Sequence, residues 1–242
     1  MTLWVVYIFL LSIGASFVQR TVGFGFGIFI MTALPWLMPS YGQATALSGL
    51  LAMTTSAVIV FKMRRYLQWR KLLPILTTFL VVSSISIFCL KRMDDVLLRK
   101  VLGVVLVLIS IYFTFFSKRV KIPPTPPFQI GMGTASGIMG GFFGMQGPPA
   151  VLYFISSSRN KEEYLALVQT YFLIGNSVMT LTRAYNGFVT ATVGKAYLCG
   201  LGGVAIGTAI GAYVFTHIPN RIFRYIVYAY IAISGIITFV SA

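Results

Sequence analysis

The feature that most constrains this chain is a series of long apolar runs, separated by short basic stretches or by stretches rich in glycine and proline. Runs such as 72–90 and 196–215 approach the roughly 20 residues that a helix needs to cross a hydrocarbon core of about 30 Å. Hydrophobic residues make up 57% of the 242 residues and charged residues only 10%, which leaves too little polar surface for a water-soluble protein. The sequence therefore predicts an all-α polytopic membrane protein.

Helix breakers divide the apolar sequence into ten candidate segments. These are 3–18, 24–38, 43–61, 72–90, 96–116, 128–139, 148–157, 164–181, 196–215 and 222–241. The segments 128–139 and 148–157 are too short to cross a bilayer at about 1.5 Å per residue. We therefore expect half-helices or one broken hairpin there, and 24–38, which contains Pro35, is marginal as well.

The second half of the chain repeats the order of the first half. A shift of 125 places DDVLLRKVLGVVLVLISIYFTF (94–115) on PNRIFRYIVYAYIAISGIITFV (219–240), and a shift of about 117 places VGFGFGIFIMTALP on MGGFFGMQGPPAVLY. Such ordered self-similarity indicates internal repeats. We predict two membrane repeats, 1–116 and 128–242, of about five segments each, joined by a Pro-rich basic linker at 117–127. Because five is odd, the second repeat has inverted topology.

The distribution of Lys and Arg provides a check on this topology. With the linker on the cytoplasmic side, 13 of the 19 basic residues lie on that side and six on the other, as the positive-inside rule requires. The formal charge of +15 is then a property of loops between membrane segments and not a sign of nucleic-acid binding. We expect the lipid bilayer as a partner, no nucleic acid, and the plasma (inner) membrane of a prokaryote as the location.

Two glycine-rich breaks, RTVGFGFG (20–27) and GGFFGMQGPP (140–149), occupy equivalent places in the two repeats. Backbone N–H groups at membrane depth stay unpaired only where protein or a water-filled cavity covers them. Interrupted segments in inverted repeats are typical of secondary transporters whose site lies near the bilayer midplane. Helix N-termini directed at one point favour an anion, so we predict a substrate site where the two breaks meet.

The expected binding groups are backbone N–H groups of the breaks, together with polar side chains from nearby segments. Gln169 and Asn176 are seven residues apart and so share a helix face, and Pro148 can begin a helix because its first N–H groups are unpaired anyway. Arg20 and Arg183 are candidates for a fixed positive charge, although either side chain could instead extend to the headgroups. The predicted substrate-binding set is Gly23, Gly25, Gly27, Gly140, Gly141, Gly144, Gln146, Gly147, Pro148, Gln169, Asn176 and Arg20.

Simpler structural roles compete with binding at several of these positions. Glycines spaced by four residues at 133–141 and 203–211 form small-residue ladders that allow close helix packing, and we expect packing for the second ladder. Hydroxyl residues of segment 43–61, such as Thr45 and Ser48, are expected to bond to carbonyls of their own helix.

Catalytic groups are scarce inside the apolar segments. The four acids, Asp94, Asp95, Glu162 and Glu163, fall at segment junctions, and the single histidine, His217, lies at a segment end. This pattern disfavours a cation substrate and a membrane hydrolase. We expect no enzymatic activity, no cofactor and no metal, whereas a coupling ion, either a proton or sodium, is left open.

The motifs RTVGFGFGIFIMTALP and SGIMGGFFGMQGPPAVLYF resemble the paired motifs of the TauE/SafE sulfite exporter family. This resemblance spans nearly the whole chain, although the first motif alternates glycine with phenylalanine and the second has Met145-Gln146 where many members keep glycine. It implies a secondary transporter with two homologous halves that moves sulfite, an organosulfonate or another small organosulfur anion by alternating access. A passive small-anion channel and a transporter of a small carboxylate are the alternatives.

Overall fold

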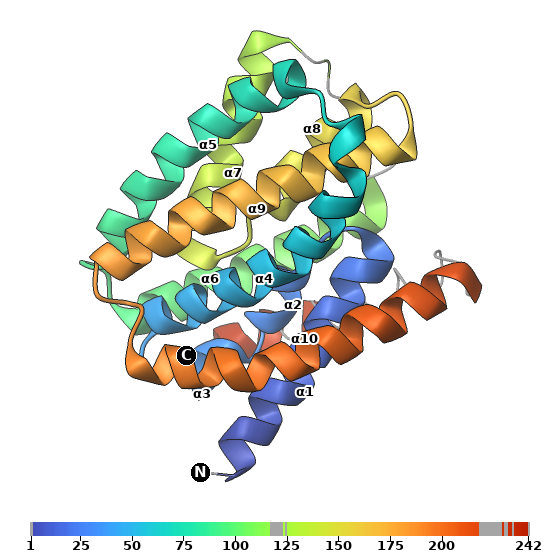
Figure 1. Ribbon diagram of the computed structural model, residues 1–242. Coiled ribbons are helices and arrows are strands. Elements are labelled where there is room, and N and C mark those ends of the chain that lie inside the picture. Colours follow the sequence, from blue (N-terminus) through green and yellow to red (C-terminus); the bar gives the residue numbers. More distant parts are fainter. Residues whose placement is uncertain are drawn as a thin grey trace.

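The computed structural model describes residues 2–116, 123, 125–217, 229, 232–233 and 235–241, and within these residues all regular structure is helical (Figure 1). Among these residues five helices are long and apolar enough to cross a membrane. They are α1 (Thr2–Val22), α4 (Tyr41–Met63), α5 (Trp69–Leu90), α9 (Lys161–Tyr185) and α10 (Ala191–His217). The predicted class, an all-α polytopic membrane protein, is confirmed.

Shorter helices complete the described fold. They are α2 (Phe26–Ile30), α3 (Leu34–Leu37), α6 (Asp95–Ile111) with a π-helical continuation at Tyr112–Phe116, α7 (Pro126–Phe143), α8 (Gly147–Ser157) and a 3₁₀ turn at Arg64–Tyr66. Residues 235–241 are also helical. Most of the predicted linker, and half of the predicted last segment 222–241, lie outside the described residues.

The second break is narrower than the sequence predicts. Helix α7 has 18 residues instead of the expected 12, and it contains Gly140 and Gly141. The helix ends at Gly144, whose φ is +67°, and the N–H groups of Gly144 and Met145 donate to carbonyls of Gly140 and Met139. These hydrogen bonds are typical of a helix C-terminus at which a glycine adopts the left-handed conformation. The expectation of two half-helices around this break is therefore wrong for α7 and right for the 11-residue α8.

Three helix pairs form the body of the molecule: α1 packs on α10, α5 on α7, and α4 on α9. The α4–α9 pair lies between the other two pairs (Figure 1), through contacts of α4 with α10 and of α5 with α9. The two outer pairs correspond to each other if α1 is matched with α7 and α10 is matched with α5. These are the contacts that two-fold related repeats would make, while the repeats themselves stay a prediction.

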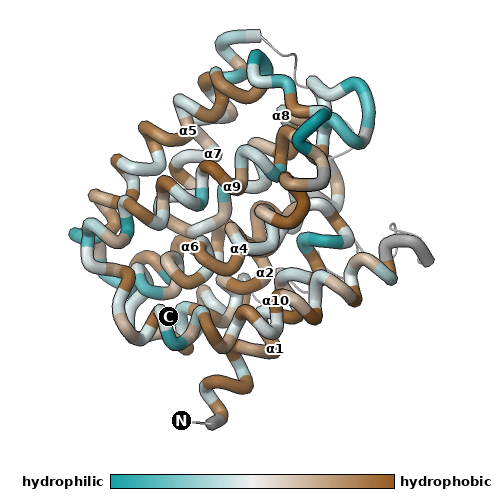
Figure 2. The backbone as a smooth tube through the Cα atoms, in the orientation of Figure 1, coloured by the Kyte–Doolittle hydropathy of each residue, from teal (hydrophilic) through white to brown (hydrophobic). Residues whose placement is uncertain are grey.

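The polarity of the surface follows the membrane assignment. Hydrophilic residues gather mainly at helix ends and connections, whereas the helices are apolar along much of their length (Figure 2). Large apolar side chains such as Val81, Ile85, Leu181 and Leu198 are exposed on the outer helix faces. Exposed apolar side chains on this scale suit a protein in contact with lipid.

The acidic residues begin helices, as their position at segment junctions predicts. Asp94 caps α6 by accepting the N–H groups of Val96 and Leu97, and Glu163 lies in the first turn of α9. Negative charge is favourable at a helix N-terminus. Glu163 also forms an ion pair with Lys71 of α5, which in addition donates to the Ser157 carbonyl. This pair ties α5 to the connection between α8 and α9.

Close packing of α1 on α10 depends on the glycine ladder of α10. A Cβ at Gly207 would lie 2.2 Å from the Ile13 carbonyl oxygen, and one at Gly203 would lie 2.4 Å from the Phe9 carbonyl oxygen. No side chain fits at such distances, so the packing role predicted for this ladder is confirmed.

We expect Gly207→Ala to separate α1 from α10 and to lower the free energy of unfolding by about 1–3 kcal/mol, the usual effect of overpacking. Gly194→Ala is the matched control in the same helix, because no atom lies within 4 Å of its Cβ position. Thermal unfolding of the detergent-purified variants measures both. Equal melting temperatures for the two variants would contradict the assigned contact.

Candidate functional site

The two glycine-rich breaks touch each other at backbone distance. A Cβ at Gly27 would lie 2.1 Å from the carbonyl oxygen of Gly144. This distance is too short for any side chain larger than hydrogen. Gly27 belongs to the first break and Gly144 to the second, although 117 residues separate them. The prediction that the two breaks meet therefore agrees with the geometry.

Each break forms because glycine accepts backbone conformations that other residues avoid. Gly23 and Gly25 have φ values of +89° and +104°, and Gly144 has +67°. These values lie in the left-handed region, where a Cβ is strained. The first pair ends α1 and turns the chain into α2, and Gly144 ends α7 three residues before α8 begins.

A small, partly open pocket lies where the breaks meet. Its walls come from α1, from both breaks with the starts of α2 and α8, and from the central helices α4 and α9. None of its twelve lining residues is charged. They are Gln19, Gly25, Phe26, Gly27, Ile28, Ala52, Gly144, Met145, Gln146, Gly147, Phe172 and Asn176.

Backbone donors are available at this pocket because two helices begin there. The first N–H groups of a helix have no partner within it, and α2 begins at Phe26 while α8 begins at Gly147. The N–H groups of Gly144 and Met145 are already used to close α7. The backbone donors left at the pocket are therefore those at the start of α2 and the Gly147 N–H group, because Pro148 and Pro149 of α8 have no N–H.

Buried amide side chains connect both breaks to α9. Gln169 donates through Nε2 to the Gly23 carbonyl (3.0 Å) and accepts at Oε1 from Gln19 (3.3 Å). On the other side of the pocket, Gln146 donates to Oδ1 of Asn176 (3.0 Å). All four amides are at most 5% exposed. Buried polar groups joined in this way fix the positions of the segments that carry them.

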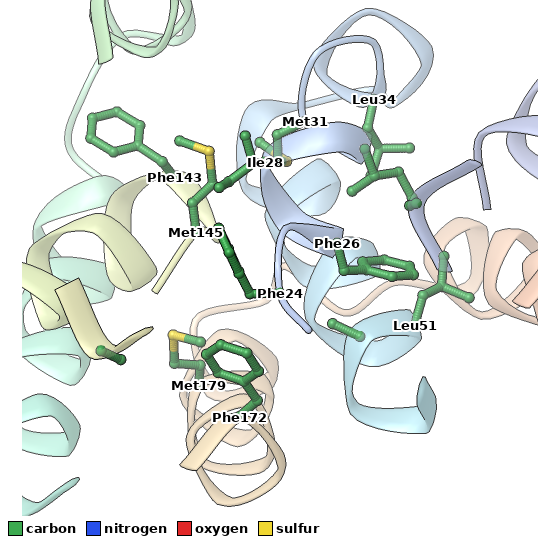
Figure 3. Packing of buried hydrophobic residues seen from close by; sticks show 14 of the residues in the cluster. Phe24, Phe26, Ile28, Met31, Leu34, Leu51, Phe143, Met145, Phe172 and Met179 are labelled. Carbon is green, nitrogen blue, oxygen red and sulfur yellow. The ribbon is translucent and has the colours of Figure 1, made fainter. Parts of the chain in front are cut away.

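Apolar side chains complete the wall between these amides. A Cβ at Gly147 would lie 3.6 Å from both Phe172 and Phe24, and Figure 3 shows Phe24 lying between Met145 and Phe172. Such apolar surroundings strengthen the electrostatic attraction between the pocket's N–H donors and a bound anion.

Six of the predicted substrate-binding residues line the pocket, namely Gly25, Gly27, Gly144, Gln146, Gly147 and Asn176. Gly23 and Gln169 lie directly behind it, in the amide network. Pro148 is buried in the first turn of α8. The structure thus brings most of the predicted set to one place.

Three predicted residues lie elsewhere. Gly140 and Gly141 are helical, and a Cβ at Gly141 would lie 2.4 Å from Ser86 of α5, so they serve helix packing. Arg20 does not line the pocket, because its side-chain stem packs at Gly211 of α10. A turn of about 100° per helical residue directs Gln19, and not Arg20, toward the breaks.

The sequence interpretation missed several lining residues, of which Gln19 is the most informative. It is 2% exposed. Ser12, Ser16 and Gln19 are all buried and follow one another at spacings of four and three residues. That spacing marks one polar face of an otherwise apolar helix and could have identified Gln19. Ala52 and Phe172 carry no comparable signal in the sequence.

Of the two roles that the sequence leaves open for Arg183, its burial does not fit extension of the side chain to the headgroups. It is 0% exposed, and Nη2 donates to the carbonyls of Gly140 (2.8 Å) and Gly141 (3.2 Å) at the end of α7. The C-terminal end of a helix attracts a positive charge, which explains why a guanidinium is accommodated there.

A multi-pass helical protein whose broken helices enclose a small uncharged pocket is a membrane transporter in its architecture. The family model described as sulfite exporter TauE/SafE matches residues 8–238. The chain belongs to this family of transporters, as the sequence motifs predict. It is 23% identical over 213 residues to the probable sulfite/organosulfonate exporter TauE of Cupriavidus necator, covering 84% of this chain and 80% of that protein. No solved structure matches significantly.

The contact between the breaks is open to a direct test. Gly27→Ala places a methyl group against the Gly144 carbonyl and is expected to lower the free energy of unfolding by about 1–3 kcal/mol through overpacking. Gly147→Ala is its control, because that methyl would lie at ordinary contact distance from Phe172 and Phe24. Thermal unfolding in detergent compares them, and a Gly27→Ala protein as stable as the control would show that the breaks do not touch.

Proposed function

We propose that this protein transports a small oxyanion, sulfite or an organosulfonate, across the membrane by alternating access around the pocket between the two breaks. The observation that carries the proposal is the approach of Gly27 to the Gly144 carbonyl, because it brings the starts of α2 and α8 to one uncharged pocket. Family membership and the name of the relative from C. necator support the substrate class.

An anion suits this pocket because the pocket offers hydrogen-bond donors and none of its lining residues carries a negative charge. The amide groups of Gln146 and Asn176, the N–H groups at the start of α2 and the N–H group of Gly147 can each donate to an oxyanion. A cation would require carboxylates or a cluster of carbonyl oxygens, and no acid lines the pocket. Hydrogen bonds made in an apolar enclosure can replace the water that a small anion loses on entry.

The packing of the helices supports movement of two outer pairs about a central pair. Helices α4 and α9 contact each other as well as both outer pairs, α1–α10 and α5–α7. Rocking of one half against the other would expose the pocket to opposite sides in turn. A proton or sodium ion is the proposed coupling ion, and the plasma membrane of a prokaryote is the proposed location.

Replacing Gln146 by leucine removes its amide while keeping its approximate size, so binding of sulfite should weaken about ten- to hundredfold, as expected for the loss of a hydrogen bond to a charged ligand. Gln129→Leu is the matched control, because Gln129 also makes one side-chain hydrogen bond, to Tyr153, away from the pocket. Equilibrium binding of labelled sulfite to the purified protein provides the measurement. Equal weakening in both variants would reject the pocket as the binding site.

Transport in proteoliposomes separates a carrier from a passive channel. A carrier should show saturable sulfite uptake that accelerates when the vesicles are preloaded with the substrate, because the loaded pocket returns faster than the unloaded one. Uptake that is linear in concentration and insensitive to preloading would establish a channel instead. Competition by acetate that is as strong as competition by a sulfonate would favour the carboxylate alternative.

A further inference from the structure

Beside the pocket, the α4–α9 pair encloses a positive charge without an acidic partner. Arg183 is fully buried, and although Nη2 donates to α7, its Nε and Nη1 groups have no hydrogen-bond partner. In the part of the chain that the structure describes, the ion pair is between Lys71 and Glu163, and Arg183 takes no part in it. The carbonyls at the end of α7 compensate part of this charge, and a bound negative charge would stabilise the buried guanidinium further.

Hydroxyl groups without partners lie on the same two helices. Ser48 and Thr180 each have a buried hydroxyl oxygen with no hydrogen-bond partner, unlike Thr45, which bonds to the Gly42 carbonyl as the sequence predicts. Tyr41, at the start of α4, also has an unpartnered buried hydroxyl. Buried hydroxyls rarely lack partners, and each can donate a hydrogen bond to an anion.

Gly49 of α4 lies next to Arg183 and Thr180. Its Cβ position lies 3.4 Å from Nη1 of Arg183, 3.4 Å from the Thr180 hydroxyl oxygen and 3.8 Å from Oδ1 of Asn176. Because glycine has no side chain, Gly49 places no atom beyond its Cα beside the guanidinium and this hydroxyl. A larger residue would cover both donors.

The surroundings of Gly49 adjoin the pocket. Asn176 lines the pocket and also faces Gly49, and the Ser48 hydroxyl lies 3.7 Å from the Cβ position of Gly144 in the second break. The hydrogen bond between Gln146 and Asn176 therefore lies between the pocket and Arg183.

We propose that Arg183 and Thr180 form a second anion-binding station next to the pocket. The ligand is a small anion that accepts hydrogen bonds from Nη1 of Arg183 and from the Thr180 hydroxyl. It is either the transported oxyanion or a chloride ion that stays as a counter-ion. Only the first identity rests on the proposed function, since the unpartnered charge of Arg183 calls for an anion in both cases.

The test compares Gly49→Ala and Thr180→Val with wild type. The first places a methyl group beside Nη1 of Arg183 and the Thr180 hydroxyl at ordinary contact distance, so the fold accepts it while an anion held by both groups is crowded. The second removes a hydroxyl while keeping the shape. Gly131→Ala is the control, a helical glycine with no atom within 4 Å of its Cβ position. Thermal unfolding is followed in chloride-free gluconate buffer during separate titrations with chloride and with sulfite, because an anion that binds the folded state raises the melting temperature.

We expect at least one anion to stabilise wild type and the control equally, and its apparent Kd to rise about tenfold or more in both station variants. An effect on sulfite identifies a substrate station, and an effect on chloride alone identifies a counter-ion site. If both variants respond to both anions as wild type does, or if neither anion stabilises wild type, the station does not exist.

The pocket and the station can fail separately in this design. Sulfite binding weakened by Gln146→Leu but unchanged by Gly49→Ala and Thr180→Val would retain the pocket and overturn the station. Binding weakened by the two station variants but unchanged by Gln146→Leu would retain the station and overturn the pocket.

Discussion

The contact of Gly27 with the Gly144 carbonyl is the constraint on which the rest of the site depends. It holds two chain reversals together at backbone distance, which only residues without a side chain allow. As a result the starts of α2 and α8 share one pocket, and the amide of Gln169 reaches Gln19 of α1 and the Gly23 carbonyl of the first break. A side chain at Gly27 would separate these elements.

Helix α9 combines stabilising and binding roles on one face. Gln169, Asn176, Thr180 and Arg183 follow one another at spacings of seven, four and three residues, which places them on the same side of the helix. The first two bind the breaks, and Arg183 holds the C-terminal end of α7 through two carbonyls. The negative end of the α7 dipole compensates part of the guanidinium charge. The part of the guanidinium charge that the dipole leaves uncompensated is the basis for the anion that we propose at Arg183.

The predictions that succeeded rest on properties that act locally. Apolar runs of spanning length required helices, and left-handed glycines at Gly25 and Gly144 produced breaks where the sequence placed them. Gly140 and Gly141 were assigned to the break because they adjoin it, yet they are helical, since α7 needs small residues against α5. Local composition does not distinguish a glycine that ends a helix from one that lets two helices touch.

The sequence by itself determined the membrane environment, the helical class, the two breaks and the family, because each follows from hydrophobicity and backbone freedom along a short stretch. Tertiary structure decided that Gln19, and not Arg20, faces the pocket, since the direction of a helix face depends on what packs around it. It also decided that Arg183 is buried against the end of α7. Charge placement depends on partners distant in the chain, and folding brings those partners together.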